Sequence, residues 1–332
     1  MADRAASRAD FLRRAGWADA RESPLAADAS FRSYTRLSRR GGTAMLMDAP
    51  PPEDVRPFVR IAHHLVQLGL SAPLVLAADA TNGFLLLEDF GDETFTRALD
   101  AGADPAPLYS LAIDAMIALH AHPQATAVLA PRHDAVLLAD EGASLFVDWY
   151  LPEATRREIP ATRRAEFLAL WREALAPALA GPTTLALRDF HVDNLMILPG
   201  RAGAARCGLL DFQDAALGHP AYDLVSLLED ARREVSPAIV AAMRARHAAA
   251  LPHLTGAAFD AAYAALGAAR HARVVGLWVR LWRRDGKPGY LRHLPRTWRL
   301  LEAALAAPGL AALRAWFDRH APAAARRLPE AA

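Results

Sequence analysis

The sequence predicts an α+β protein of two lobes, a small β-rich lobe followed by a larger and mainly helical one. Three observations lead to this prediction. The first quarter of the chain holds short runs of β-favouring residues separated by turn signals, with one longer helical segment among them. From about residue 105 onward, the apolar residues recur at helical spacing. One short extended stretch, residues 185–212, interrupts these later helices.

Two helices are expected in the small lobe. Residues 5–16 predict a short helix that turns Phe11 and Leu12 inward. Residues 53–69 show apolar side chains at helical spacing, and Gly69 is a plausible stop signal because glycine readily adopts a left-handed conformation.

Four strands are expected in the same lobe, where the extended pattern begins at about residue 22. They are rich in aromatic and β-branched or other apolar residues, and they lie at residues 31–37, 43–47, 74–77 and 84–87. Gly41-Gly42 supplies a turn between the first two strands, and Asn82-Gly83 supplies one between the last two. The strands therefore predict two hairpins.

The large lobe is expected to be helical around one short hairpin. Residues 195–198 and 208–212 read as the strands of that hairpin. Later helices are expected at residues 153–174, 258–283 and 297–318. A hinge at residues 86–91 would join an N-lobe of residues 1–90 to a C-lobe of residues 91–332, with a cleft between the lobes.

Composition and charge narrow the class of protein. A chain of 332 residues suits two lobes, and a hydrophobic content of 53% is enough for a sizeable core. The net charge of +1 gives no electrostatic argument for a nucleic acid or a membrane surface as partner. The single cysteine, Cys207, excludes an internal disulfide and fits a reducing compartment. Without a signal-peptide pattern or a long apolar run, a cytoplasmic protein is expected.

The strongest functional signal lies at residues 187–214. Asp189 and Asn194 are five positions apart, and Asp211 follows downstream with an aromatic residue, Phe212, after it. This spacing matches the kinase catalytic loop H-R-D-x-x-x-x-N and the first two positions of D-F-G. Phosphoryl transfer needs one carboxylate to orient the attacking hydroxyl, and an amide and a second carboxylate to hold Mg²⁺ on the nucleotide. Any one of these residues alone also fits a turn, but the three together favour a kinase.

The sequence resembles the aminoglycoside phosphotransferase and choline kinase superfamily over most of its length. More narrowly, it is similar to the anomeric sugar kinases of peptidoglycan recycling, which phosphorylate N-acetylmuramate and N-acetylglucosamine at C1. The segments that carry this resemblance are DASFR (28–32), MDAPP (47–51), RDFHVDNL (188–195), LLDFQD (209–214), GHPAYDL (218–224) and RDGKP (284–288). The resemblance implies a protein-kinase-like fold.

The resemblance also implies roles for residues of the catalytic segment. Asp189 would be the catalytic carboxylate, which aligns the sugar hydroxyl with the γ-phosphate of ATP. Asn194 and Asp211 would coordinate Mg²⁺ through oxygen atoms. Asp223 would hydrogen-bond the backbone of the catalytic loop, in which Arg188 precedes the catalytic residue. A plain helix N-cap is the alternative for Asp223.

The segments expected to bind the phosphates depart from the kinase pattern. Ser30, Phe31 and Arg32 lie where kinases place a glycine-rich loop, yet this segment contains no glycine. Ser30 could still offer its hydroxyl and backbone N–H to a phosphate, with an ordinary hairpin turn as the alternative. Met47 stands where the strand-three lysine is expected, and the only lysine of the chain is Lys287. Arg32 is the candidate replacement, with a solvated strand face as the alternative.

The hinge is expected to pair its backbone groups with the adenine edge. Its nucleotide-binding candidates are Leu87, Glu88, Asp89 and Phe90. A strand end followed by a loop is the alternative interpretation.

Five residues are candidates for substrate contacts. His191 and Asp193 lie inside the catalytic loop, and Asp214 follows the second metal ligand closely, so all three could contact sugar hydroxyls. Trp149 and Tyr150 belong to an aromatic-rich break, and exposed aromatic rings often stack on sugars. A half-buried packing role is the more common one for such residues.

The sequence therefore predicts an ATP- and Mg²⁺-dependent sugar kinase that makes sugar 1-phosphates. A kinase of an aminoglycoside, choline or homoserine is one alternative. A nucleotide-binding pseudokinase scaffold is another; the missing lysine and glycines favour it, and the intact Asp189, Asn194 and Asp211 oppose it. The expected partners are a small sugar and ATP rather than a nucleic acid or a membrane, and a monomer is expected.

Overall fold

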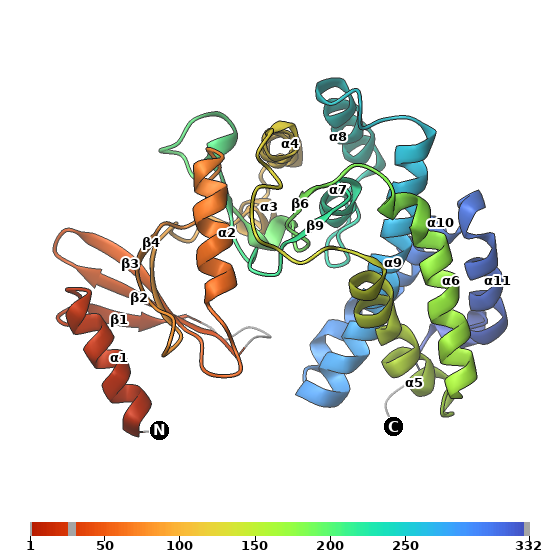
Figure 1. Cartoon of the computed structure of the whole chain (residues 1–332), viewed down its shortest axis with the longest axis horizontal. Helices are drawn as coiled ribbons and strands as arrows, with labels where there is room; N and C mark the ends of the chain where they lie inside the picture. Colours follow the sequence, from red (N-terminus) through yellow and green to blue (C-terminus); the bar gives the residue numbers. More distant parts are fainter. Residues whose placement is uncertain (1, 26–30, 329–332) are drawn as a thin grey trace. The chain divides into compact units, whose positions relative to one another are not determined.

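The computed structural model describes residues 2–25 and 31–328 (Figure 1). It divides into two compact units, Met1–Ala130 with Val192–Ala215 and Pro131–His191 with Ala216–Ala332. The predicted α+β class is confirmed, because the first unit holds an antiparallel sheet and the second is mainly helical. The lobe boundary at residues 86–91 stays a prediction. Ser30 lies outside the described residues.

The first unit is built on a five-stranded antiparallel sheet with the strand order β1-β2-β3-β5-β4. The strands are β1 (Arg21–Pro24), β2 (Ser33–Arg39), β3 (Gly42–Asp48), β4 (Val75–Asp79) and β5 (Phe84–Glu88). Four of them match the predicted strands. β1 was not predicted as a separate strand, because all four of its residues are exposed and show no hydrophobic alternation.

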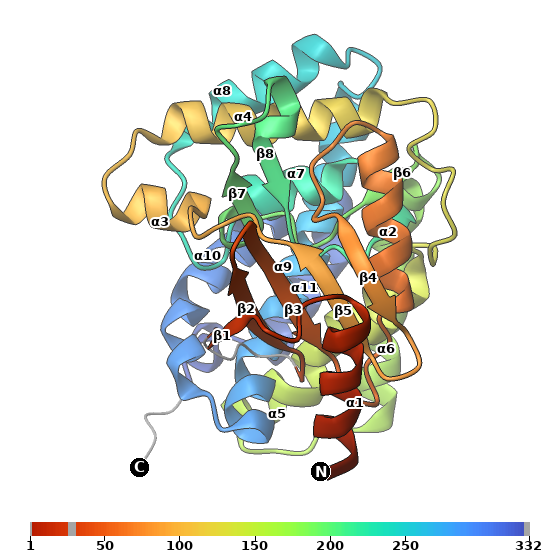
Figure 2. The same cartoon turned by 90° about the vertical axis from the view of Figure 1, so that its left-hand side faces the viewer.

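A hydrophobic core lies between this sheet and α1 (Ala2–Arg14). Side chains alternate along each strand, so Leu37, Leu46 and Phe84 share one face and pack against this helix. Phe11 and Leu12 are buried in the same core, which confirms their predicted inward orientation. Figure 2 views the sheet with α1 in front of it, and Figure 1 shows α1 and α2 on opposite sides of the sheet.

Helix α2 (Arg56–Gln67) begins and ends where its sequence allows. Pro57 lies in the first turn, where a missing N–H removes no helical hydrogen bond. Gly69 adopts φ +79° just after the helix, a conformation that most residues rarely adopt. The predicted stop signal at Gly69 is therefore confirmed.

Two helices and a hairpin complete the first unit, namely α3 (Phe95–Asp100), α4 (Pro105–Ala121), β7 (Leu195–Ile197) and β8 (Cys207–Leu209). Backbone hydrogen bonds hold the hairpin in place, from Leu209 N to Ser71 O at 2.7 Å and from Ile197 N to Glu93 O at 2.8 Å. The strand expected at residues 208–212 ends at Leu209. Asp211 has left the strand, because its φ of +57° is incompatible with an extended backbone.

The second unit packs its helices around the long α9 (Ala257–Asp285). Its other elements are α5 (Leu151–Thr155), α6 (Ala161–Leu179), α7 (Ala221–Leu228), α8 (Pro237–Ala250), α10 (Leu294–Leu305), α11 (Ala311–His320), β6 (Thr184–Ala186) and β9 (Ala216–Gly218). β6 and β9 pair antiparallel. Two π-helices, η1 (Val136–Ala143) and η2 (Phe146–Tyr150), precede α5. The short 3₁₀ helices are η3 (Val192–Asn194), η4 (Gly203–Arg206), η5 (Pro288–His293), η6 (Pro308–Leu310) and η7 (Ala323–Arg326).

An aromatic cluster forms part of the core of the second unit. The ring of Phe146 lies 4.9 Å from that of Phe317, 5.2 Å from Tyr150 and 5.5 Å from Trp298, measured between centroids. Phe167 joins the cluster at 5.9 Å. Aromatic packing of this kind stabilises a core beyond the area that it buries.

Two helices that were expected to be continuous are interrupted. Residues 297–318 form α10 and α11, with the short η6 that starts at Pro308 between them. Residues 153–174 form parts of α5 and α6, because the left-handed Arg156 (φ +54°) ends α5 and Pro160 precedes α6. Proline disfavours a helical conformation in the residue before it, which explains the second break.

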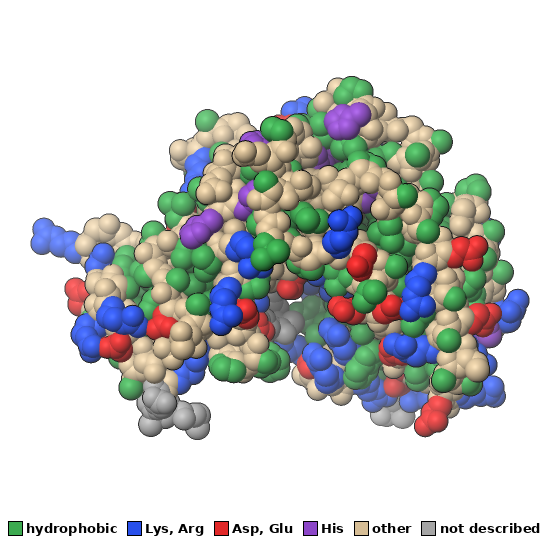
Figure 3. All heavy atoms as spheres, in the orientation of Figure 1, with side chains coloured by type: hydrophobic (Ala, Val, Ile, Leu, Met, Phe, Trp, Pro, Cys, Tyr) green, Lys and Arg blue, Asp and Glu red, His purple; other side chains and the backbone are tan. Residues whose placement is uncertain are grey.

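The face in Figure 3 shows arginine and acidic side chains interspersed rather than gathered into one large patch. Within the residues that the structure describes, no single helix has the length and apolar composition to cross a membrane, and Pro288–Leu305 with Pro308–His320, bent by 106°, meets these criteria only as a pair.

Candidate functional site

The loop that carries Asp189 follows β6 in the second unit and is fixed by a buried carboxylate. Asp223 on α7 is 1% exposed and accepts hydrogen bonds from the backbone N–H groups of Leu187 (2.6 Å) and Arg188 (2.8 Å). Ser226, one turn further along α7, donates its hydroxyl to the carbonyl oxygen of Arg188 (3.1 Å). Both backbone polar groups of Arg188 are therefore held by one helix.

These contacts hold Arg188 in a left-handed backbone conformation with φ +71°. Such a conformation costs a non-glycine residue about 1–3 kcal/mol, so the surrounding contacts must maintain it. The N-cap residue of α7 is Pro220, and no side chain caps the helix. Asp223 lies inside the first turn, so the N-cap alternative for Asp223 is wrong. Asp223 makes the loop contact that the resemblance implied, while the catalytic role of the loop stays a prediction.

The carboxylate of Asp189 has a cationic environment within the second unit. Burial raises its pKa, but Arg273 and then His191, Arg270 and Arg188 lower it. The net pKa lies below the usual value. Burial raises the pKa of the neighbouring Asp223 to about 7. The two carboxyl groups thus differ in their preferred state, and Asp189 is the one that stays ionised in mildly acidic solution.

Asn194 and Asp211 lie close together in the first unit, on either side of the β7–β8 hairpin. Asn194 Nδ2 donates to Asp211 Oδ2 at 3.4 Å, and Gln213 Nε2 donates to Asp211 Oδ1 at 2.8 Å. The backbone is also joined here, from Leu210 N to Asn194 O at 2.9 Å. An amide and a carboxylate at this separation offer the oxygen atoms that Mg²⁺ prefers, so the residues fit such an ion.

No group of three or more histidine, cysteine or acidic residues suited to a metal occurs within the described part of the chain. Two protein ligands are nevertheless sufficient for Mg²⁺ in kinases, because substrate phosphates and water complete its shell. Asp189 belongs to the second unit, and Asn194 and Asp211 belong to the first. Their convergence on one nucleotide therefore stays a prediction.

The strand position of the missing lysine lies across from a tyrosine that interacts with an arginine. Tyr34 on β2 lies directly across from Met47 on β3. Arg32, two residues before Tyr34, bonds Glu53 through Nε at 2.9 Å and Nη2 at 2.8 Å. Burial raises the pKa of Tyr34 to about 12; Arg32 opposes this rise and the charge of Asp211 adds to it. Arg32, Tyr34 and Asp211 are therefore close enough to interact electrostatically in the first unit.

The predicted hinge residues make several contacts within the first unit. Leu87 is 3% exposed, and the backbone N–H of Glu88 donates to Leu74 O at 2.8 Å, so that N–H is already used. Glu88 forms an ion pair with Arg201 at 2.5 Å, and the same guanidinium lies 5.0 Å above the ring of Phe90. Asp89 pairs with Arg36 at 2.8 Å. Adenine recognition by this segment stays a prediction.

The predicted substrate residues have different surroundings. His191 is buried, and its Nε2 accepts from Arg232 Nη1 at 3.0 Å. Burial lowers the pKa of His191, so the ring is neutral at neutral pH and carries its hydrogen on Nδ1. Asp193 accepts from the hydroxyl of Thr96, and Asp214 is exposed.

The two aromatic candidates lie on η2 and differ in exposure. Trp149 is half-buried, whereas Tyr150 is fully buried. The Tyr150 hydroxyl donates to Ala325 O at 2.8 Å, and its ring lies 5.3 Å from that of Trp298. These contacts are those of a packing residue, and a sugar contact by either ring stays a prediction.

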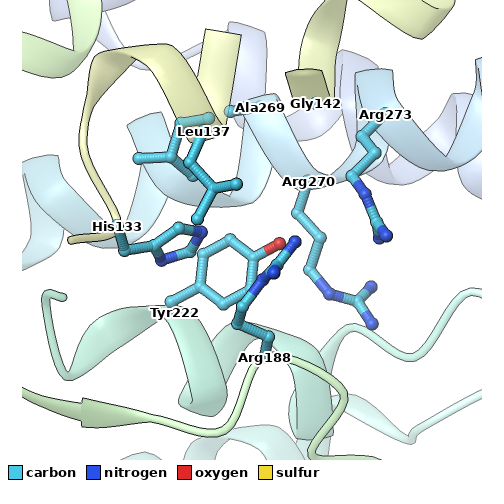
Figure 4. Close-up of a pocket in the computed structure, with 9 residues that line it drawn as sticks. His133, Leu137, Gly142, Arg188, Tyr222, Ala269, Arg270 and Arg273 are labelled. Carbon is cyan, nitrogen blue, oxygen red and sulfur yellow. The ribbon is translucent and has the colours of Figure 1, made fainter. Parts of the chain in front are cut away.

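A pocket in the second unit contains residues that the sequence did not single out (Figure 4). It is lined by His133, Leu137, Leu138, Gly142, Arg188, Tyr222, Ala269, Arg270 and Arg273. The ring of His133 meets that of Tyr222 edge-on at 4.4 Å. Burial lowers the pKa of His133 to about 3, so its ring is neutral at neutral pH.

One feature of the sequence could have pointed to this pocket. Arg270 and Arg273, with His271 between them, interrupt an apolar helical run, and the two arginines lie three residues apart, so both face the same side of α9. A buried arginine in such a run requires a partner or a ligand. In a sequence with 38 basic residues, this pattern did not stand out.

Comparison with known proteins gives a consistent result. The sequence pattern of the phosphotransferase enzyme family matches residues 21–259. A Caulobacter vibrioides protein named N-acetylmuramate/N-acetylglucosamine kinase is 42% identical, with 98% of this chain and 99% of that protein covered. A Pseudomonas aeruginosa protein of the same name is 37% identical over 88% of this chain and 86% of its own length.

The fold of the chain is similar to those of solved phosphotransferase structures. The GDP complex of wild-type aminoglycoside 2′-phosphotransferase-IIIa matches with a TM-score of 0.58 over 91% of this chain and 98% of that one, at 15% identity. At this identity the match supports a shared kinase-like fold and carries no information on the substrate.

Proposed function

The chain belongs to the phosphotransferase enzyme family, and from this premise we propose that it transfers the γ-phosphate of ATP to the anomeric hydroxyl of N-acetylmuramate and N-acetylglucosamine. The product would be the sugar 1-phosphate, for use in cell-wall recycling. The observation that carries the choice of substrate is the near full-length similarity to kinases named for these two sugars. Because ATP is the donor, the cytoplasm is the proposed compartment.

The proposed catalytic residue is Asp189. Its low pKa keeps the carboxylate ionised, so it can accept a hydrogen bond from the anomeric hydroxyl and orient an oxygen lone pair toward the γ-phosphate. As the oxygen–phosphorus bond forms and the bond to the ADP oxygen breaks, the hydroxyl proton passes to the Asp189 carboxylate, which releases it to solvent. The hydrogen bonds from the loop backbone to Asp223 and from Ser226 to the loop backbone support this role, because they fix the backbone next to Asp189.

We propose that Asn194 and Asp211 hold Mg²⁺ through their side-chain oxygens. When bound, the ion neutralises charge on the nucleotide phosphates. Arg32 is the proposed cation beside the phosphates, and its pairing with Glu53 resembles the pairing of the strand lysine with a helix glutamate in protein kinases. This arrangement would replace the lysine whose position Met47 occupies.

The proposal is tested with a panel of acceptors and a measurement of ADP release by the purified protein. N-acetylmuramate and N-acetylglucosamine should turn over, and phosphorus NMR should show a phosphate on C1. Kanamycin, choline and homoserine should not. If one of these three were the efficient acceptor, the substrate assignment would be wrong while the kinase assignment would remain.

A further inference from the structure

The pocket of Figure 4 is lined by positively charged side chains. Three of its lining residues are arginines, Arg188, Arg270 and Arg273, and none is acidic. Arg188 extends from the loop before Asp189, and the two others extend toward it from α9 (Figure 4). Three guanidinium groups that face the same small space repel one another, so the arrangement is suited to an anion.

Arg270 carries buried donors that the described residues leave without an acceptor. The side chain is 5% exposed, and its Nη2 donates to Ser226 Oγ at 2.9 Å. Among the residues that the structure describes, its Nε and Nη1 have no hydrogen-bond acceptor. Buried guanidinium donors without an acceptor are costly, and a carboxylate can accept from two of them at once.

Acidic groups near the pocket offset part of this positive charge. Asp189 interacts electrostatically with all three arginines, Asp223 accepts hydrogen bonds from the backbone of the loop, and Glu229 interacts electrostatically with Arg270. Glu229 also bonds His271 Nε2 at 2.7 Å. None of these three carboxyl groups lines the pocket.

We propose that Arg270 and Arg273 bind the lactyl carboxylate of N-acetylmuramate and thereby set its preference over N-acetylglucosamine. This inference rests on the proposed function. The two sugars differ only in the lactyl ether on C3, two ring carbons from the anomeric carbon whose hydroxyl would meet Asp189. Arg188 lines the pocket with Arg270 and Arg273 and directly precedes Asp189, so the arginines lie on the side of the loop where that substituent would be held.

The preference is measured as the ratio of kcat/KM for N-acetylmuramate to kcat/KM for N-acetylglucosamine. In Arg273→Gln and Arg270→Gln this ratio should fall roughly ten- to hundredfold, the range expected for loss of a hydrogen bond between charged groups. A matched control is Arg280→Gln. Arg280 is a half-buried arginine of the same helix, two turns after Arg273, and it does not line the pocket. Its ratio should equal that of the wild type.

A second measurement needs no variant and therefore does not depend on folding. With the wild type, the methyl ester of N-acetylmuramate should have a kcat/KM lower than that of the free acid by at least the factor that either single arginine substitution causes. In a further check, a double variant that carries both Arg270→Gln and Arg273→Gln should use the acid and the ester equally well.

The possible outcomes separate this inference from the proposed function. If the wild type phosphorylates both sugars and the ratio is unchanged in both arginine variants, the carboxylate-binding role is refuted and the kinase assignment stands. An equal loss for both sugars would also refute it, because the arginines would then act on Asp189 or on folding. If the wild type phosphorylates neither sugar, the proposed function itself fails.

Discussion

Asp189 and Asp223 are neighbouring carboxyl groups whose pKa values are shifted in opposite directions by their surroundings. Asp189 is surrounded by arginines that keep it ionised, whereas burial raises the pKa of Asp223 to about 7. The active form of a carboxylate that orients a hydroxyl is the ionised one. The carboxylate is ionised at pH values above its pKa and becomes protonated as the pH falls below that value. A low pKa therefore keeps the enzyme active at lower pH.

The acidity of Asp189 leads to a pH prediction. With N-acetylglucosamine as acceptor, the acid limb of kcat/KM should lie below about pH 3.9, the ordinary aspartate pKa. In Arg273→Gln this limb should move to higher pH, since the strongest cationic influence on Asp189 is gone. Circular dichroism at each pH would separate titration from unfolding. An unchanged or more acidic limb in the variant would contradict this electrostatic explanation.

Asp223 and Ser226 both hold the backbone of Arg188, and we expect the loss of Asp223 to destabilise the protein more than the loss of Ser226. Asp223→Asn leaves one buried backbone N–H without an acceptor and should lower the free energy of unfolding by about 1–3 kcal/mol. Ser226→Ala removes a hydrogen bond to the carbonyl of Arg188, along with the Oγ that accepts from Arg270, and should cost about 0.5–1.5 kcal/mol. Urea denaturation at pH 8 measures both. A larger loss in Ser226→Ala would show that Asp223 is not the main support.

Helix α9 positions both the arginine pocket and the aromatic core, and one of its glycines permits a close backbone approach. A Cβ at Gly276 would lie 2.2 Å from the backbone of Leu145, so no side chain fits there. At Gly267 on the same helix, the nearest atom to such a Cβ is 3.5 Å away on Val225, an ordinary contact. The two glycines therefore serve different purposes in the same helix.

This difference gives a matched pair of substitutions. Gly276→Ala should destabilise the protein by at least about 1–3 kcal/mol, because the helix must move away from Leu145. Gly267→Ala should be neutral or stabilise by up to about 1 kcal/mol, since alanine favours a helix. Thermal unfolding of both variants measures the difference, and equal midpoints would rule out the close crossing.

The first unit as a whole should respond to the nucleotide through its own metal ligands. MgADP at about 100 times its Kd should raise the free energy of unfolding of the wild type by about 2.7 kcal/mol. The Mg²⁺-dependent part of this gain should vanish in Asp211→Asn and persist in Asp189→Asn, because only the former residue is a proposed ligand. Thermal shifts with and without EDTA measure it. A Mg²⁺ effect that survives in Asp211→Asn would contradict the proposed metal site.

The sequence predicted the features of the fold and site that depend on local signals. Helical spacing and turn residues placed α1, α2 and four of the five sheet strands, and Phe11 and Leu12 are buried as expected. The edge strand β1 lacked alternation, and the breaks in the later helices arise at single residues such as Arg156. Such breaks are weak signals in an alanine-rich sequence.

The catalytic segment was recognised because its residues are close in sequence, whereas the arginine pocket was not. His133, Tyr222 and Arg270 lie on segments far apart in the chain, and only the folded second unit brings them together. No spacing rule links them. Their shared environment is a property of tertiary packing, which sequence patterns reflect poorly.

The most direct test of the central claim is the rate of Asp189→Asn with N-acetylglucosamine and MgATP under saturating conditions, with circular dichroism as the check on folding. If Asp189 orients the anomeric hydroxyl, kcat should fall by about 10²–10⁴ in a variant that is folded like the wild type. A folded variant with the rate of the wild type would show that Asp189 is not the catalytic carboxylate.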